Sequence, residues 1–306
     1  MQLNETKAFA AWGSDAEVDR SIPSPSSKVT LPQLTVGGKK MSLEEVTRVA
    51  FFKTMVSLDP GTLQHVGEKT ITSSGSKAAE VPIYNSSATG SVLPREACRA
   101  AILQLIIIWM QGRSGVRMAA IEFLADLLNS GCVPVFTSLA SAPLELLLTC
   151  NGQYAKCLSS SDNSVKAASV ALRECSLTPF SLNNTEMCAI LQGEFAFTGM
   201  AGFVCGYAQK SFQILDVVAA MSCEAAGVTL GDSIDPAVFE LLRPQRGQMS
   251  SASNLKLLLD GSRNCNGAAG DNDAVFKATP QIHGPAFETS LSSCRCVICM
   301  NVVSVM

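Results

Sequence analysis

The chain has 306 residues, of which 47% are hydrophobic and 16% charged, and its net charge at pH 7 is −3. This length allows one large domain or two small ones, and the slightly acidic balance lacks the basic footprint of a nucleic-acid-binding protein. No run reaches the roughly 18 uninterrupted apolar residues of a membrane span, and the polar start lacks a signal-peptide pattern. Twelve scattered cysteines favour reduced thiols. We expect a cytoplasmic protein that binds neither nucleic acid nor membrane.

The N-terminal 38 residues contain clusters of Ser, Pro and Gly and are predicted to form a flexible extension. A short strand pair is expected between Lys28 and Met41. Ser42 and Glu45 form a capping-box pattern, which predicts that a helix begins there. One large, partial domain is assigned to residues 39–290, and residues 291–306 form a separate tail.

Two apolar helices are predicted in the middle of the chain. The segment from Ala97 to Met110 is apolar around nearly its whole circumference, which is typical of a core helix. A second helix over Ile121–Leu128 is expected to end at Asn129-Ser130-Gly131, because glycine accommodates the left-handed turn that closes many helices.

The longest helical pattern runs from Glu186 to Ala226. Small residues among its large apolar ones would allow another helix to approach closely. Asp235-Pro236 interrupts the pattern, and a second amphipathic segment closes at Gly261. We predict a mainly α, long-helix bundle with strand content below about a fifth of residues.

Three cysteines lie close together in the tail, at Cys294, Cys296 and Cys299. A fourth ligand at suitable spacing is lacking, so no metal site is expected. His283 is expected to form a structural hydrogen bond rather than act as a catalyst.

Ordered anchors along the long helical hairpin resemble those of aromatic amino acid ammonia-lyases, the phenylalanine and histidine ammonia-lyases. They are Leu182, Glu186, Ala189-Ile190-Leu191, Gly193, Glu224-Ala225, Asp235-Pro236, Arg243-Pro244, Gly247-Gln248 and Leu258–Ser262. Upstream, the match continues through Leu93-Pro94, Arg99–Leu103 and Gln111–Arg117. The resemblance implies the ammonia-lyase (fumarase/aspartase-like) helical bundle with a small N-terminal strand element, and the family's C-terminal half is absent.

The resemblance also assigns candidate catalytic residues. Tyr84 lies near the position of the family's catalytic base, although an exposed loop tyrosine is an equal alternative. Ala140-Ser141-Ala142 corresponds to the Ala-Ser-Gly tripeptide that cyclises to the family's methylidene-imidazolone (MIO) electrophile. Ala142 replaces the glycine whose nitrogen attacks in a tight turn; alternatively, the tripeptide is deleted and these residues form an ordinary buried turn. We expect an uncyclised peptide, with no cofactor bound.

The resemblance places candidate substrate-binding residues at Gln192, Lys277 and Gln281. Gln192 aligns with an asparagine that helps hold the electrophile. Lys277 aligns with the arginine that clamps the substrate carboxylate, and it keeps the charge but loses the bidentate fork.

The family eliminates ammonia from an α-amino acid, and its active sites combine residues of several subunits, which implies a homo-oligomer such as a homotetramer. One hypothesis is an active lyase with an altered site. The hypothesis that we favour is a protein with impaired or lost activity, which packs with copies of itself or with a full-length homologue as a non-catalytic subunit or scaffold. An unrelated helical scaffold would not explain the ordered anchors.

Overall fold

The computed structural model describes residues 33–37, 41–51, 54–72, 92–152, 156–158, 164–191, 194–242, 244–265 and 274–303. Helices make up 68% and strands 7% of these residues, so the mainly α prediction is confirmed. Most of the predicted N-terminal extension, Tyr84 and Gln192 lie outside them.

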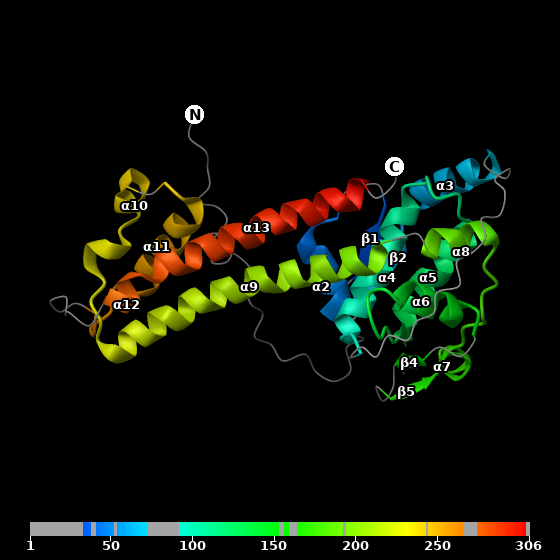
Figure 1. The fold of residues 1–306 in the computed structure, drawn as a ribbon, viewed down its shortest axis with the longest axis horizontal. Coiled ribbons are helices and arrows are strands. Elements are labelled where there is room, and N and C mark those ends of the chain that lie inside the picture. The colour runs from blue at the N-terminus through cyan, green and yellow to red at the C-terminus, as the bar shows by residue number, and fades with distance from the viewer. Residues whose placement is uncertain are drawn as a thin grey trace, which may run out of the picture. The chain divides into compact units, whose positions relative to one another are not determined.

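The described residues form short strands, long helices and one 3-10 helix, η1 (Figure 1). In chain order the elements are β1 (Gln33–Val36), α2 (Leu43–Phe51), β2 (Met55–Leu58), α3 (Pro60–Thr72), α4 (Arg95–Met110), α5 (Met118–Ser130), β3 (Val133–Pro134), α6 (Ala142–Cys150), β4 (Lys156–Leu158), β5 (Val165–Ala167), α7 (Ala168–Glu174), α8 (Asn184–Leu191), α9 (Phe195–Ala226), η1 (Gly231–Ile234), α10 (Pro236–Leu242), α11 (Arg246–Leu258), α12 (Ala274–Lys277) and α13 (Thr279–Val303).

Helix α4 is the centre of the main hydrophobic core, as its apolar circumference predicts. Thirteen of its 16 residues are buried, and the helix packs against α2, α5 and α9. The contact with α9 is close, since a Cβ added to Gly199 would lie 2.5 Å from the Cα of Ala101. Only glycine allows the two backbones to approach this far.

The one cation buried within α4 forms hydrogen bonds with the C-terminal carbonyl groups of two neighbouring helices. Arg99 is 4% exposed and donates to the carbonyl oxygens of Val49, in the last turn of α2, and Leu128, in the last turn of α5. Helix C-termini carry unpaired carbonyls and a partial negative charge, both of which favour a guanidinium. Burial lowers the pKa of Arg99 to about 10.

The predicted start of α2 and the predicted stop of α5 at Gly131 are confirmed, whereas α5 begins at Met118, three residues before the predicted Ile121. Ser42 and Glu45 form the reciprocal capping box, with the Ser42 amide donating to Glu45 Oε2 and the Glu45 amide donating to Ser42 Oγ. Gly131 follows α5 in the left-handed conformation, at φ 76°.

The strand prediction needs correction. β1 pairs in parallel with β2, from Gln33↔Met55 to Val36↔Leu58, so the partner of the first strand lies beyond Met41, after α2. A parallel pair needs a crossover connection, and α2 supplies it. A second sheet, the antiparallel β3-β4-β5, was not predicted, because strands of two or three residues are too short to show a period in the sequence.

The predicted helix from Glu186 to Ala226 is two helices. α8 ends at Leu191, α9 begins at Phe195, and their axes differ by 45°. Apolar periodicity continues through the break, so it does not reveal the bend. Beyond it, α9 runs for 32 residues to Gly227, which takes the left-handed conformation.

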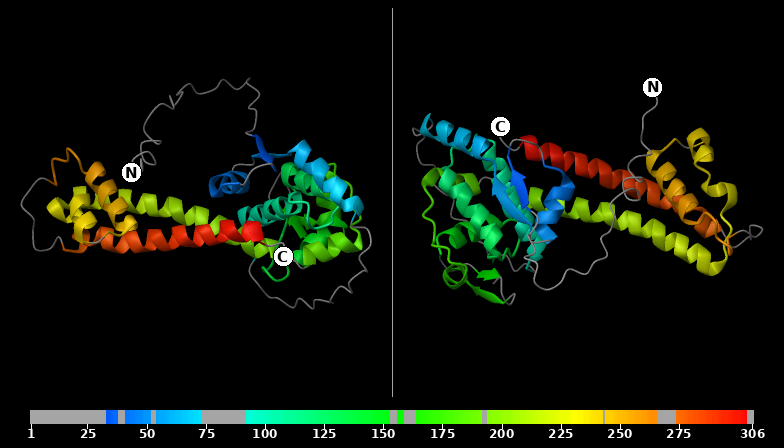
Figure 2. Two further views of the ribbon diagram at one scale, coloured as in Figure 1. Left: turned by 90° about the horizontal axis from the view of Figure 1, so that it is seen from above. Right: turned by 180° about the vertical axis from the view of Figure 1, so that it is seen from behind.

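Helices α9, α11 and α13 pack together, and α9 and α13 lie side by side along much of their length (Figure 2). α11 crosses α13 where Gly247 meets Gly284, since a Cβ on Gly247 would lie 2.2 Å from the Gly284 carbonyl oxygen. η1, α10 and α12 join these helices, and the interruption predicted at Asp235-Pro236 separates η1 from α10.

Among the described residues, no single helix has the length and apolar character to cross a membrane. The bent pair of α8 and α9 meets that length-and-composition criterion only when taken together. This pair includes α9 side chains that are buried against α4, such as Phe195 and Ala196.

Candidate functional site

Ala140, Ser141 and Ala142 lie in a turn that leads into α6, in which Ser141 and Ala142 are buried and Ala140 is exposed. Ser138 and Ser141 bond reciprocally: the Ser141 amide donates to Ser138 Oγ at 3.1 Å, and the Ser138 amide donates to Ser141 Oγ at 3.1 Å. The pattern is like that of a capping box with serine in place of the usual Glu or Gln, but it closes the turn that precedes α6. The hydroxyl predicted as a source of the electrophile is therefore engaged in hydrogen bonds within this turn.

A second pair of residues, Thr137 and Glu145, also stabilises the turn. Glu145, one turn into α6, accepts the Thr137 amide at 2.9 Å and the Thr137 hydroxyl at 2.6 Å. The Thr137 hydroxyl also lies 3.0 Å from Ser141 Oγ. Ser141 is 2% exposed and Ala142 is fully buried, so the hydrogen bonds satisfy groups that water cannot reach.

The residues in this turn do not fit the family's self-formed MIO group. Ring closure requires the nitrogen of Ala142 to attack the carbonyl carbon of Ala140. That amide instead donates to the Ser138 carbonyl oxygen at 3.1 Å. The Cβ of Ala142 adds bulk where the family has glycine, and Ala142 is fully buried, where close packing opposes a change of backbone conformation.

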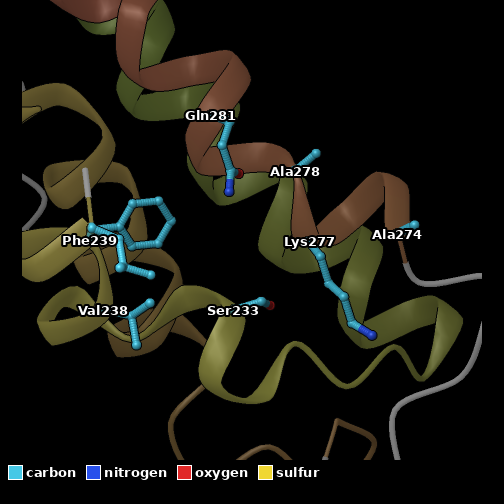
Figure 3. Close-up of a pocket in the computed structure, with 8 residues that line it drawn as sticks. Ser233, Val238, Phe239, Ala274, Lys277, Ala278 and Gln281 are labelled. Atoms are coloured by element: carbon cyan, nitrogen blue, oxygen red, sulfur yellow. The ribbon is translucent and has the colours of Figure 1, made fainter.

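Lys277 and Gln281 line a different feature, an open pocket of about 460 Å³ formed by η1, α10, α12 and α13 (Figure 3). Its apolar wall consists of Val238, Phe239 and Leu242. In the orientation that satisfies its hydrogen bonds, the amide nitrogen of Gln281 donates to the carbonyls of Lys277 and Ala278. The amide oxygen of Gln281 then remains as an acceptor, and the Lys277 side chain extends from a different part of the pocket lining (Figure 3).

The two groups of predicted residues lie far apart within the chain. Phe136, beside the turn, contacts Phe195 at the start of α9 with ring centroids 6.5 Å apart. Asp216 lies 21 positions farther along α9, or about 30 Å at 1.5 Å per residue. Asp216 contacts His283, two residues after Gln281. The turn and the pocket are therefore at opposite ends of α9.

Tyr84 and Gln192 belong to the part of the chain that the structure does not describe, so their roles stay predictions. The side chains of Cys294, Cys296 and Cys299 also fall outside it. Among the described residues, no group of three or more His, Cys, Asp or Glu side chains has an arrangement that could hold a metal ion.

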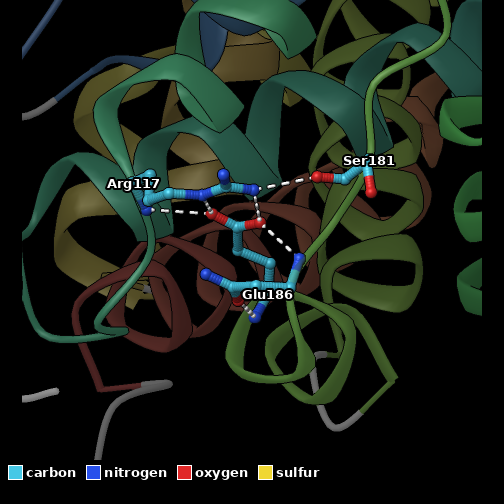
Figure 4. A network of polar contacts seen from close by, with 4 residues as sticks. Arg117, Ser181 and Glu186 are labelled. Carbon is cyan, nitrogen blue, oxygen red and sulfur yellow. Dashed lines mark hydrogen bonds and ion pairs between the residues drawn. The ribbon is translucent and has the colours of Figure 1, made fainter.

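A buried carboxylate beside α6 was not predicted from the sequence. Glu186 is fully buried in α8, which packs on α6, and it forms a bidentate pair with Arg117 through two 2.7 Å bonds (Figure 4). It also accepts the Arg117 and Asn183 amides. These bonds raise the pKa of the Arg117 guanidinium. The Asn183-x-x-Glu186 spacing is a capping pattern that could have indicated part of this network.

A second polar centre lies between α9, α11 and α13. The carboxylate of Asp216, 5% exposed, accepts the Ser251 hydroxyl at 2.7 Å and the Asn254 amide at 2.8 Å. His283 Nδ1 lies 2.8 Å from the same carboxylate. His283 thus forms the structural hydrogen bond predicted for it. Three helices are linked through one carboxylate.

Comparisons with known proteins agree with this fold. A family model described as aromatic amino acid lyase matches residues 79–306. Histidine ammonia-lyase from Gloeobacter violaceus is 31% identical over 231 residues, covering 71% of this chain and 43% of that protein. The solved histidine ammonia-lyase from Trypanosoma cruzi has a TM-score of 0.75 at 17% identity, covering 89% of this chain and 57% of that one.

The phenylalanine aminomutase of Pantoea agglomerans superposes almost as well, with a TM-score of 0.74 at 20% identity over 88% of this chain and 62% of that one. The likeness to both solved structures concerns the fold. The chain spans less than half the length of the Gloeobacter violaceus relative.

Proposed function

The chain belongs to the aromatic amino acid lyase family, and from this premise we propose that it is a family member whose ammonia elimination is impaired or lost. One observation carries the proposal. The Ala142 amide, which would have to attack the Ala140 carbonyl, instead donates to the Ser138 carbonyl at 3.1 Å, and Ala142 is fully buried.

The loss of the electrophile would remove the group that contributes most to catalysis of the reaction. The β-proton of an amino acid is poorly acidic, and a general base alone contributes typically 10²–10⁴-fold to a rate. Tyr84 is our candidate for that base. Without the electrophile, a correctly placed base would leave most of the barrier in place, so turnover should be absent or very slow.

The test is the mass of the intact chain, together with an ultraviolet difference spectrum before and after borohydride. We expect the unmodified mass, no borohydride-sensitive absorbance, and no ammonia release from phenylalanine or histidine. A loss of two waters mapped to Ala140–Ala142 would overturn the proposal. The variant Ala142→Gly isolates the role of the Cβ. We expect it also to stay uncyclised, because the Ser138–Ser141 hydrogen bonds remain.

The pocket at Lys277 supports retained binding of an amino acid. A carboxylate could pair with the Lys277 ammonium, an amino group could donate to Gln281 Oε1, and an aromatic ring could lie on Val238 and Phe239. Calorimetric titration with phenylalanine and histidine tests this. Lys277→Met should weaken binding. Lys256→Met, which removes an exposed lysine paired with Asp235, should not.

A second candidate function, a non-catalytic subunit or scaffold, is favoured by the outer face of the second half of α9. Ile214 and Met221 are 62% and 66% exposed there, and Val217 and Val218 are exposed as well. Contiguous apolar surface of this kind marks interaction sites or favours association. We propose copies of this chain or a full-length homologue as partners. Light scattering tests this: a monodisperse monomer that ignores a co-expressed homologue would contradict it.

A further inference from the structure

The pocket formed by η1, α10, α12 and α13 contains an unbalanced charge. Among the described residues that line it, Lys277 is the only one with a formal charge. The Lys277 side chain is half-buried, and no ion pair between described residues includes it. A ligand in this pocket therefore meets one cation, with no anion among the described lining residues to balance it.

The carboxylates of α10 and its start do not supply the missing charge. Asp235, which precedes α10, accepts the Ala237 amide at 3.2 Å and pairs with Lys256 Nζ at 3.3 Å. Glu240 is exposed, and neither carboxylate is among the residues that line the pocket. The Lys277 ammonium is thus left for a ligand.

Lys277 is also the main donor that the described lining offers. The single proton of the Ser233 hydroxyl is donated to the Leu230 carbonyl. The amide nitrogen of Gln281 donates to the carbonyls of Lys277 and Ala278. A carboxylate matches the remaining ammonium, because it accepts hydrogen bonds at two oxygens and carries the opposite charge.

The facing wall suits an apolar body. Figure 3 shows Val238 and Phe239 of α10 across from the segment that contains Lys277 and Gln281. Phe239 is buried by its own packing, whereas Val238 and Leu242 are 38% and 70% exposed. A ligand that covers this exposed apolar surface removes it from water, which favours binding. The lining therefore matches one carboxylate attached to an apolar group.

We propose that this pocket binds apolar monocarboxylates without an amino group more tightly than the corresponding α-amino acids. The inference rests on the ligand binding at Lys277 proposed above. An α-amino acid has its ammonium on the carbon next to the carboxylate, so pairing with Lys277 brings a second cation close to the first. Like charges at this separation repel. The Gln281 oxygen is neutral and lies in a different part of the lining, so it does not offset the repulsion.

The test is calorimetric titration of the intact chain with four ligands of similar size: phenylpropionate, phenyllactate, phenylalanine and phenethylamine. Phenyllactate has a hydroxyl where phenylalanine has its ammonium, so it separates charge from shape. We expect phenylpropionate and phenyllactate to bind about fivefold or more tightly than phenylalanine, because charges this close interact appreciably even in water. Phenethylamine, which has the cation and no carboxylate, should not bind.

Two substitutions at Lys277 show whether the ammonium sets this preference. Lys277→Met should weaken the binding of both acids and bring phenylpropionate and phenylalanine to within about twofold of each other, because the charge that distinguishes them is gone. Lys277→Arg retains a cation and should keep the preference. The matched control is Lys166→Met in β5, whose ammonium pairs with Glu174, and it should leave all four titrations unchanged.

The inference would be overturned if phenylalanine or phenethylamine bound as tightly as phenylpropionate, if phenyllactate bound as weakly as phenylalanine, or if the preference survived in Lys277→Met. Failure of all four ligands to bind would overturn it as well. The impaired elimination is tested separately, by the intact mass at Ala140–Ala142. A dehydrated tripeptide together with the expected preference would overturn the proposed function alone.

Discussion

The two ends of α9 lie in very different surroundings. Around its start, a cluster of 37 buried hydrophobic residues joins β1 through α8 to the first residues of α9. Around its far end, with η1 and α11, a second cluster has seven buried members. There Leu241, Leu242 and Leu257 are 84%, 70% and 65% exposed.

This difference shows that one continuous helix can connect a region with a large core of its own to one with little. Burial of apolar surface contributes roughly 25 cal/mol per Å², so the first region has most of the hydrophobic stabilisation among the described residues. The far region instead depends on specific contacts, namely the Asp216 network and the Gly247–Gly284 crossing. Its exposed leucines are suited to a neighbouring surface.

The same substitution made in each region gives the sharpest test of this comparison and the largest expected effect. Gly199→Ala forces a Cβ against the backbone of α4, and Gly247→Ala forces one against the backbone of α13. Overpacking of this kind costs about 3 kcal/mol. Hydrogen exchange should show that Gly199→Ala lowers protection throughout α4, α5 and α9, whereas Gly247→Ala affects α11 and α13.

Gly61→Ala is the control for both variants. A Cβ there would lie 3.6 Å from the Asp59 carboxylate, an ordinary van der Waals contact, and alanine favours the helix. We expect no loss of stability. If Gly247→Ala reduced the protection of α4 as strongly as Gly199→Ala does, the two regions would be one cooperative unit.

The next effect comes from the ion pair of the first region. Arg117→Ala leaves Glu186 fully buried without its cation and should cost about 2 kcal/mol in thermal or denaturant unfolding. The exposed pair of Arg48 and Glu44 is the control, because Arg48→Ala should change stability by less than about 0.5 kcal/mol. Equal effects of the two substitutions would contradict the structural role of Glu186.

In the far region, Asp216→Ala removes the acceptor shared by Ser251, Asn254 and His283. Leaving these donors without it should cost about 1–2 kcal/mol, seen as lost amide protection in α11 and α13. His283→Ala removes one partner only and should cost less. A larger effect for His283→Ala would mean that the histidine makes a more important contact elsewhere.

The smallest effect on stability is expected at the exposed leucines. Leu241→Ser and Leu257→Ser bury no new polar group, so stability should change by less than about 0.5 kcal/mol. Their effect should appear in association instead, as a smaller particle mass in light scattering. Unchanged association would show that these leucines are not part of an interface.

The helices were predictable because each has a local sequence pattern that indicates it. The Ser42–Glu45 cap, the apolar α4 and the glycine after α5 all follow from local chemistry, and the ordered anchors identified the family. The parallel β1–β2 pair could not be predicted, because its partners are separated by a helix and Asn129 completes it from α5, donating to and accepting from the Val56 backbone.

The candidate site was less predictable than the fold. The sequence identified Ala142 as a departure from the family tripeptide, but the hydrogen bonds of Ser141 depend on its packing against Ser138 and Thr137 in the folded turn. Lys277 and Gln281 line a pocket whose other wall comes from α10, about 40 residues earlier in the chain. Contacts at such separations are set by packing and leave no periodic pattern.

The burial of α4 also has a consequence for biosynthesis. About 85 residues separate the end of α4 at Met110 from the start of α9 at Phe195, so at ~5–20 residues per second a ribosome needs on the order of 4–17 s to supply the partner helix. During that interval, the side of α4 at Ala100 and Ala101 lacks the helix that finally packs on it at Gly199. A newly made chain therefore passes through a stage at which a chaperone that recognises apolar helices would bind it, and expression at lower temperature or with extra chaperone should raise the yield of folded protein.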